Sequence, residues 1–228
     1  RAGAHFGWEQ CRTVARPHAG GTSLAITAPV DQLFLATEVN EWALCAAWVE
    51  RHPARRADIE AALLAQALQA VAGAPDAIAP VIDESAAFAR FERLAGVESR
   101  PKLGALLQAA AARGLPQVID EEQLTLGAGS GGRSFPLTGL PEVADVPWEQ
   151  LRDIPTALVT GSNGKTTTVR LLAACARAQG WRAGYNCTDG VFLDDEALLL
   201  GDYSGPAGAR RVLREPRVDA AILETARG

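Results

Sequence analysis

The chain of 228 residues has no methionine, two tyrosines, and only two lysines against twenty arginines. It also lacks any stretch of about 18 apolar residues, the length that a membrane-spanning helix requires. No basic segment followed by an apolar run opens the sequence, so it shows no secretory signal. We therefore expect a cytoplasmic protein without membrane contacts. Because the chain opens on Arg1, we expect the natural N-terminus to lie outside it.

Cysteine, histidine and charge exclude several classes of site. The four cysteines lack C-x-x-C spacing, which favours reduced thiols over a disulfide framework or a zinc site. The three histidines all lie in the first 52 residues, and we interpret them as surface or packing residues. A net charge of −5 argues against a general nucleic-acid binder. Hydrophobic content of 48% with 21% charged residues is typical of a globular protein.

The most informative segment is residues 157–168, Ala-Leu-Val-Thr-Gly-Ser-Asn-Gly-Lys-Thr-Thr-Thr. An apolar strand runs into a glycine-framed Lys-Thr pair and then a helix, the order of a phosphate-binding P-loop. Lys165, the candidate catalytic residue, can reach the outer phosphates of a bound nucleotide, and the Thr166 hydroxyl can bind Mg²⁺. The predicted nucleotide-binding residues are Gly161, Ser162, Asn163, Gly164, Lys165, Thr166 and Thr167.

Two observations bear on how specific this motif is. The general P-loop pattern has a glycine where this chain has Val159, so the sequence is a shorter variant. Lys165 is one of only two lysines in an arginine-rich chain, which suggests that a compact ammonium is needed there. The alternative is a glycine-rich strand-to-helix turn beside an ordinary surface lysine. The complete strand, loop and helix order disfavours it.

Hydrophobic periodicity predicts an α/β protein. We expect an N-terminal α+β domain over residues 1–137, a proline-rich linker over 138–153 and a P-loop ATP-binding domain over 154–228. In the first domain, Ser85 is the expected N-cap of one helix and Pro101 the expected start of another. The segments expected there are a strand at 22–27, helices starting at Asp31, near Ile59, at Ser85 and at Pro101, and strands at 123–126 and 133–137. The apolar stripe of the second of these helices runs from Ile59 to Val71.

The C-terminal part alternates short apolar strands with helices, the pattern of a parallel sheet covered on both faces. Acidic residues 194–196 sit between apolar runs and predict a hairpin tip. Since the sequence stops after the last strand, we expect this domain to be incomplete. The expected segments are strands at 156–159, 182–186 and 218–223, and helices at 165–178 and from Pro206.

The glycines of residues 127–132 match G-x-G-x-x-G, the dinucleotide-binding fingerprint. That fingerprint requires a following helix to receive a pyrophosphate. Here Arg-Ser-Phe-Pro-Leu follows, which is strand-like and interrupted by proline. We therefore interpret the segment as a hairpin turn.

Polar residues at strand ends are the remaining candidates. Glu224 ends an apolar strand next to the P-loop strand, where a carboxylate points into the nucleotide crevice, and we favour a metal-ligand role over a solvated one. The Thr188 hydroxyl can reach the metal, or Thr188 and Asp189 can shape a turn, and the sequence leaves both open. For Ser204, helix capping is favoured over substrate contact.

Four motifs in order resemble the Mur ligase family, closest to its cyanophycin-synthetase-like branch. They occupy residues 160–168, 187–190, 201–206 and 223–228. The resemblance implies a Mur ligase central-domain-like sheet and an amide ligase that uses ATP and Mg²⁺. It implies Lys165 on the β- and γ-phosphates and Thr166, Glu224 and Thr188 on the metal. No ATP-grasp domain separates the N-terminal part from the P-loop, unlike in cyanophycin synthetases, and Cys187 replaces their usual threonine.

The predicted reaction is ATP-dependent amide bond formation through an acyl phosphate, with an amino acid or peptide as the small-molecule partner. We expect no nucleic-acid partner, and a homo-oligomer is compatible with the sequence. A P-loop NTPase or phosphotransferase is one alternative, and a non-catalytic nucleotide-binding module is another. The acid and amine that are joined, and the role of the N-terminal domain, are left open.

Overall fold

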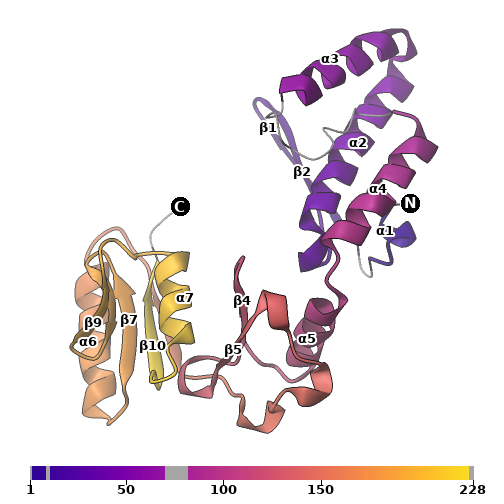
Figure 1. Cartoon of the computed structure of the whole chain (residues 1–228). Helices are drawn as coiled ribbons and strands as arrows, with labels where there is room; N and C mark the ends of the chain where they lie inside the picture. The colour runs from indigo at the N-terminus through magenta and orange to yellow at the C-terminus, as the bar shows by residue number, and fades with distance from the viewer. Residues whose placement is uncertain (1, 9–10, 70–81, 226–228) are drawn as a thin grey trace. The chain divides into compact units, whose positions relative to one another are not determined.

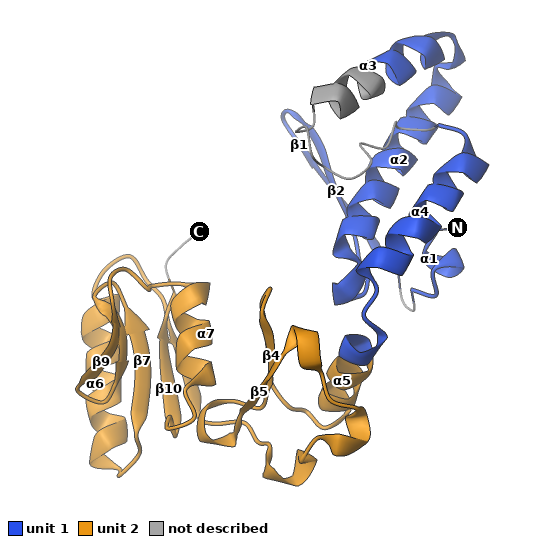
Figure 2. Cartoon of the chain, viewed as in Figure 1, with its two compact units in different colours: residues 1–104 blue, residues 105–228 orange. Residues whose placement is uncertain are grey.

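The computed structural model describes residues 2–8, 11–69 and 82–225. For residues 63–69 it describes the backbone alone. The chain combines helices with β-sheets, which agrees with the predicted α/β class. The chain forms two compact units, residues 1–104 and 105–228 (Figure 2). This division differs from the predicted limits at 137 and 154, and those limits stay a prediction. No helix of the described residues is long and apolar enough to cross a bilayer.

The first unit combines a two-stranded antiparallel sheet with helices (Figure 1). Its core gathers Trp8, Leu35, Val39, Ala87 and Phe91, drawn mainly from helices α2 and α4. The elements are α1 Ala2–His5, β1 Thr13–His18, β2 Gly21–Ile26, η1 Val30–Gln32, α2 Leu33–Arg51, η2 Pro53–Arg55, α3 Arg56–Gln69 and α4 Glu84–Glu98.

Most predicted elements of this unit are confirmed, and one cap is wrong. The helix predicted from Ser85 begins at Glu84, and the Asp83 carboxylate caps it by accepting a 2.9 Å hydrogen bond from the Ala86 N–H. Asp is as good an N-cap as Ser, so the residue two positions earlier takes the role. The stripe predicted for the second helix extends to Val71, outside the described residues. Strand β1 was not predicted, since all six of its residues are exposed.

The second unit begins with a small sheet and a run of short helices. Strands β3, β4 and β5 form an antiparallel sheet in that order. The β4–β5 pair confirms the hairpin that we predicted around the G-x-G-x-x-G segment. The elements are α5 Pro101–Ala112, which starts in the first unit, β3 Gln117–Ile119, β4 Gln123–Leu126, η3 Gly129–Gly131, β5 Arg133–Pro136, η4 Leu137–Gly139, η5 Val143–Asp145 and η6 Trp148–Gln150.

The larger sheet has the strand order β6-β10-β7-β8-β9. Strand β10 pairs in parallel with both β6 and β7, whereas β8 and β9 complete an antiparallel hairpin. The acidic segment at 194–196 lies at that hairpin's tip, as predicted. The elements are β6 Thr156–Val159, α6 Lys165–Ala178, β7 Ala183–Cys187, β8 Gly190–Leu193, β9 Glu196–Leu200, α7 Pro206–Arg214 and β10 Ala220–Glu224.

Helices α6 and α7 cover opposite faces of this sheet (Figure 1). Ile222 of β10 packs in the cluster that includes Val169 of α6, whereas its neighbours Ala221 and Leu223 pack in the cluster that includes Val212 of α7. Successive residues of a strand point to opposite faces. The alternation along β10 therefore decides which side chains face which helix.

The glycine-rich turn between β4 and β5 packs against the loop that precedes β10. The Ser130 N–H donates a 2.7 Å hydrogen bond to the Val218 carbonyl. A Cβ on Gly129, which has a φ of +50°, would lie 2.3 Å from the same carbonyl oxygen, so only glycine fits this close approach. Ala128 also joins the core beside α7. These contacts explain why residues 105–153 group with the P-loop segment.

Arg214 of α7 binds the small sheet through its side chain. Its guanidinium pairs with the Asp120 carboxylate and donates a 3.1 Å bond to the Thr125 hydroxyl. It also donates to the carbonyls of Val118 and Gln123 at 3.3 and 3.2 Å. Only 10% of the Arg214 side chain is exposed, so the pair lies largely out of water. Breaking a buried pair by removing one partner is strongly destabilising.

We expect Asp120→Asn to lower the free energy of unfolding by about 2 kcal/mol at pH 7. The hydrogen bond from Arg214 holds the pKa of Asp120 at about 2, below its ordinary value of 3.8. Because the folded-state pKa is the lower one, this stabilisation is present above pH 4 and is lost as the pH falls toward 2. Urea unfolding of the variant and the wild type across this range measures the difference.

The control is Glu121→Gln, at the exposed neighbouring position, which we expect to leave the unfolding free energy unchanged. A difference between Asp120→Asn and the wild type that stayed constant from pH 7 to pH 2 would contradict the role of the ionised carboxylate.

Candidate functional site

The candidate site is built on the connection between β6 and α6. Strand β6 ends at Val159 and α6 begins at Lys165, so residues 160–164 form the loop. Gly161 and Gly164 have φ angles of +152° and +75°, which favour glycine. No side chain of a described residue caps α6 at Gly164. The backbone N–H groups of the first turn are therefore available to an anion, assisted by the positive end of the helix dipole.

Lys165 folds back over this loop. Its ammonium donates a 3.2 Å hydrogen bond to the Gly161 carbonyl, and the side chain is half-buried. Ser162, Asn163 and Thr167 are exposed. The loop therefore places one cation and its exposed polar residues beside the N-terminus of α6.

Three predicted metal-site residues come together at this helix start. The Thr166 hydroxyl donates a 2.9 Å hydrogen bond to Oε2 of Glu224. It lies 3.4 Å from the Thr188 hydroxyl, close enough for a weak hydrogen bond. These residues come from α6, from the end of β10 and from the turn after β7. The expectation that strand-end groups converge on the P-loop agrees with these distances.

Glu224 is only 1% exposed, although it carries a carboxylate. Its Oε1 atom is buried and has no hydrogen-bond partner among the described residues. A buried carboxylate oxygen without a partner is costly, and a bound cation would remove that cost. The donor set of one carboxylate and two hydroxyls fits Mg²⁺, which typically takes one or two carboxylates with waters and substrate phosphates.

The described residues contain no group of three or more histidine, cysteine, aspartate or glutamate side chains arranged to hold a metal ion. A dedicated all-protein cage is therefore not found in this part of the chain. The arrangement around Glu224 instead fits a Mg²⁺ site in which the phosphates of a nucleotide would supply part of the coordination.

The turn after β7 is held by its own contacts. Asp189 forms an ion pair with Arg170 of α6, and its carbonyl accepts a 3.1 Å hydrogen bond from the Gly201 N–H. Asp189 thus shapes the turn, while the hydroxyl of Thr188 faces Thr166. The turn-shaping interpretation fits Asp189, and the metal-binding interpretation of Thr188 stays a prediction.

The capping role expected for Ser204 is wrong. The N-cap of α7 is Gly205, without a side-chain hydrogen bond to the helix. The Asp202 carboxylate instead accepts bonds of 3.0 Å from the Ser204 N–H and 2.7 Å from its hydroxyl. The Ser204 hydroxyl and N–H lower the pKa of Asp202 by binding its charged form. Ser204 therefore stabilises the loop 201–205 through its bonds to Asp202.

Asn186 is a buried polar residue near the site that sequence reasoning missed. It is 0% exposed, within a strand whose five residues are all buried. Its side-chain amide donates to the carbonyls of Tyr203 and Glu224 at 2.6 and 3.0 Å. Asparagine is disfavoured in strands, so its presence in an otherwise apolar strand was the available signal.

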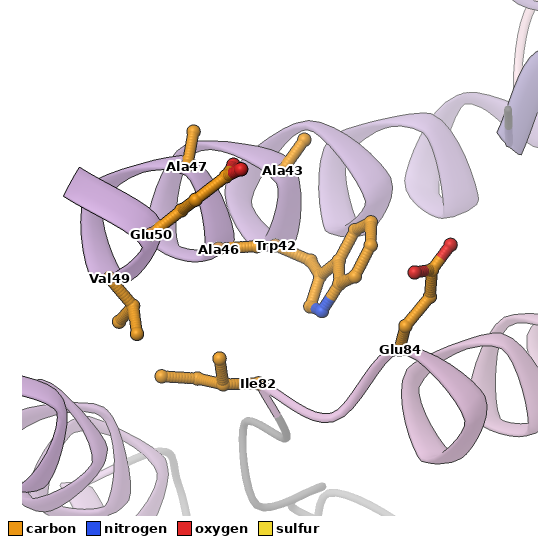
Figure 3. A pocket seen from close by; sticks show the side chains of 8 residues that line it. All are labelled: Trp42, Ala43, Ala46, Ala47, Val49, Glu50, Ile82 and Glu84. Atoms are coloured by element: carbon orange, nitrogen blue, oxygen red, sulfur yellow. The ribbon is translucent and has the colours of Figure 1, made fainter. Parts of the chain in front are cut away.

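A cavity of about 400 Å³ lies in the first unit, between α2 and the residues that begin α4 (Figure 3). Small residues Ala43, Ala46 and Ala47 line it together with Trp42 and two glutamates, Glu50 and Glu84. None of the predicted site residues takes part, and the lining shows no phosphate-binding or metal-binding arrangement.

Comparison with known proteins finds relatives for part of the chain. Over 82 residues it is 49% identical to the cyanophycin synthetase of Trichormus variabilis, an alignment that covers 36% of this chain and 9% of that protein. Over 75 residues it is 52% identical to the cyanophycin synthetase of Geminocystis herdmanii, covering 33% and 9%. No protein-family profile matches the chain.

A Mur ligase is a more distant relative. The chain is 34% identical over 93 residues to the UDP-N-acetylmuramoylalanine–D-glutamate ligase of Nitratidesulfovibrio vulgaris, covering 40% of this chain and 18% of that enzyme. The matched segments thus span less than a fifth of these relatives. The resemblance predicted from the motifs is confirmed: part of the chain is Mur ligase-like, of the cyanophycin-synthetase type.

Proposed function

We propose that this Mur ligase-like chain belongs to an ATP-dependent carbon–nitrogen ligase that joins a carboxylate to an amine through an acyl phosphate. Residues 154–228 would be the N-terminal portion of its ATP-binding domain, with a P-loop sheet of the Mur ligase central-domain kind. The single observation that carries the proposal is the 2.9 Å contact between Thr166 and the buried Glu224 at the N-terminus of α6. The relatives named above are ligases and synthetases, which supports the same class.

In this proposal the residues of the site either bind ATP and Mg²⁺ or stabilise charge on the phosphates. The loop 161–167 would bind ATP phosphates through the N–H groups at the start of α6. Thr166, Glu224 and Thr188 would hold Mg²⁺, which supplies Lewis-acid charge neutralisation on the phosphates when bound. Lys165 would stabilise negative charge on the transferred phosphoryl group.

The proposed reaction has two steps. A carboxylate oxygen of the substrate attacks the γ-phosphorus, the bond to ADP breaks, and an acyl phosphate forms. The amine nitrogen then attacks the acyl carbon, phosphate leaves and the amine gives up a proton. Phosphoryl transfer leaves little covalent work to the protein, so positioning and electrostatics are the main contributions of Lys165 and the loop. We propose an amino acid or peptide as the substrate and a cytoplasmic location.

The test measures ATP turnover by the full-length protein across pairs of amino acids and dipeptides. The ligase proposal expects release of phosphate and ADP that requires ATP, Mg²⁺, a carboxylate and an amine together. Turnover that needs no amine would identify an NTPase or phosphotransferase instead. A full-length protein that neither binds nor consumes ATP would identify a non-catalytic module.

A further inference from the structure

We propose that Asn186 is a positioning residue that fixes the Glu224 end of β10 and couples it to the loop 201–205. The inference rests on the proposed function, because it concerns how the metal-binding carboxylate is held. Asn186 itself would touch neither nucleotide nor metal.

The first observation is where the β10 ladder stops. Parallel pairing between β10 and β7 ends at the pair Leu223 and Asn186. The carbonyl of the next residue, Glu224, takes its hydrogen bond from the Asn186 side chain at 3.0 Å. Because an unpaired buried carbonyl is costly, the amide replaces a missing strand partner at the residue that bears the carboxylate.

The second observation is that Asn186 acts from the opposite face of the sheet. Its strand partners Leu223 and Val191 pack in the core beside α7. Glu224 pairs with Val159, which packs in the core beside α6, where Thr166 lies. Asn186 therefore fixes the Glu224 backbone on one side while the carboxylate is directed to the other.

The third observation is the second bond of the same amide. Asn186 donates to the Tyr203 carbonyl at 2.6 Å, and the Tyr203 N–H donates to the Cys187 carbonyl at 3.1 Å. A Cβ on Gly208 of α7 would lie 2.1 Å from the Tyr203 carbonyl oxygen and 2.9 Å from Cβ of Asn186. Gly208 of α7 thus packs closely against both the loop and Asn186, on the face where the amide makes its two bonds.

The orientation of the amide follows from its partners. Both are carbonyl oxygens, which only the NH₂ group can satisfy. The Oδ1 atom has no hydrogen-bond partner among the described residues. Asn186 therefore serves as a double donor that joins two chain segments, and a side chain with fewer donors cannot reproduce both bonds.

The experiment measures the Mg²⁺ dependence of nucleotide binding by the full-length protein. A fluorescent ATP analogue is titrated in EDTA and at increasing MgCl₂ for the wild type, Asn186→Leu and Asn186→Ser. We expect the Mg²⁺ concentration for half-maximal effect to rise on the order of 10-fold in Asn186→Leu, a typical size for coupling between sites. Asn186→Ser, with one donor, should lie between. Binding in EDTA should be unchanged, because the P-loop is untouched.

Leu193→Ala is the matched control, since Leu193 is buried in the same core beside α7. It should lower thermal stability without changing the Mg²⁺ dependence. If Asn186→Leu does not fold, Asn186→Ser decides the question. A half-maximal Mg²⁺ concentration within about two-fold of the wild type in the folded variants would overturn the inference alone. A wild-type protein that binds no nucleotide would overturn the proposed function and this inference with it.

Hydrogen exchange tests the coupling to the loop directly. Adding ATP with MgCl₂ should slow exchange of amides in the loop 201–205 of the wild type, and the slowing should be lost in Asn186→Ser. Equal slowing in both proteins would overturn the coupling, because a packing role alone would not tie the loop to the metal.

Discussion

Replacing Lys165 with alanine in the full-length protein is expected to lower the rate of the proposed ATP-dependent turnover by about 10²–10³-fold, the loss typical of removing one preorganised electrostatic stabiliser. The ammonium is held over the loop by its bond to the Gly161 carbonyl. In the proposed reaction it would already be in place when charge develops on the transferred phosphoryl group. Phosphate release at saturating ATP, carboxylate and amine measures the effect.

Two further variants test whether the effect depends on the position of the lysine and on the shape of its charged group. Lys102→Ala removes the only other lysine of the chain and should leave turnover unchanged. Lys165→Arg keeps the charge but replaces a compact ammonium by a planar guanidinium, and we expect it to lose most of the activity as well. Full activity of Lys165→Ala would remove the P-loop from the proposed mechanism.

Glu224→Gln should lower Mg²⁺-dependent turnover by about 10²-fold, since losing a metal's charge stabilisation raises the barrier by several kcal/mol. The amide keeps the shape of the side chain and can still accept the Thr166 hydrogen bond. It removes the buried charge whose Oε1 lacks a partner among the described residues. Without metal, the unfolding free energy should therefore be equal to or higher than that of the wild type.

Thermal unfolding with and without ATP and MgCl₂ measures this second effect. A ligand at about 100 times its Kd stabilises a protein by about 2.7 kcal/mol, and we expect Glu224→Gln to lose the part of that gain that depends on Mg²⁺. Glu196→Gln is the control, because Glu196 is exposed on β9. Equal stabilisation of Glu224→Gln and the wild type by Mg²⁺ would show that another group holds the metal.

The most predictable parts of the fold were segments with a clear apolar pattern that end at glycine or proline. Helix α6, flanked by Gly164 and Gly180, and the buried strand β10 have the bounds that the sequence indicated to within a few residues. Strand β1 could not be found this way, because its exposed residues carry no alternating apolar pattern. The cap of α4 was misjudged because Asp83 and Ser85 are both good capping residues and only the geometry decides between them.

The candidate site was predictable where a rule connects sequence with position. The carboxyl ends of adjacent parallel strands meet at one edge of a sheet, so Glu224 was expected beside the P-loop, and the structure places it against Thr166. Asn186 could not be assigned a role in advance. Its partners are backbone carbonyls of Tyr203 and Glu224, and the sequence does not reveal which loop returns to a given strand.

The linker over residues 138–153 and the domain limits beside it stay a prediction. Prolines between residues 136 and 155 indicated the linker, and Arg152 within it bonds through its N–H and its carbonyl to Gly131 and Ala128 of the glycine-rich turn. Proline-rich segments and true linkers share a composition, so the sequence could not predict these tertiary contacts.

The close approach of Gly129 to the Val218 carbonyl has a consequence for tolerance to heat. A methyl group at Gly129 would displace the loop that leads into β10 without touching residues 160–164 of the β6–α6 loop. We therefore expect a protein with alanine at this turn to unfold at a lower temperature than the wild type, although the change lies outside the candidate site.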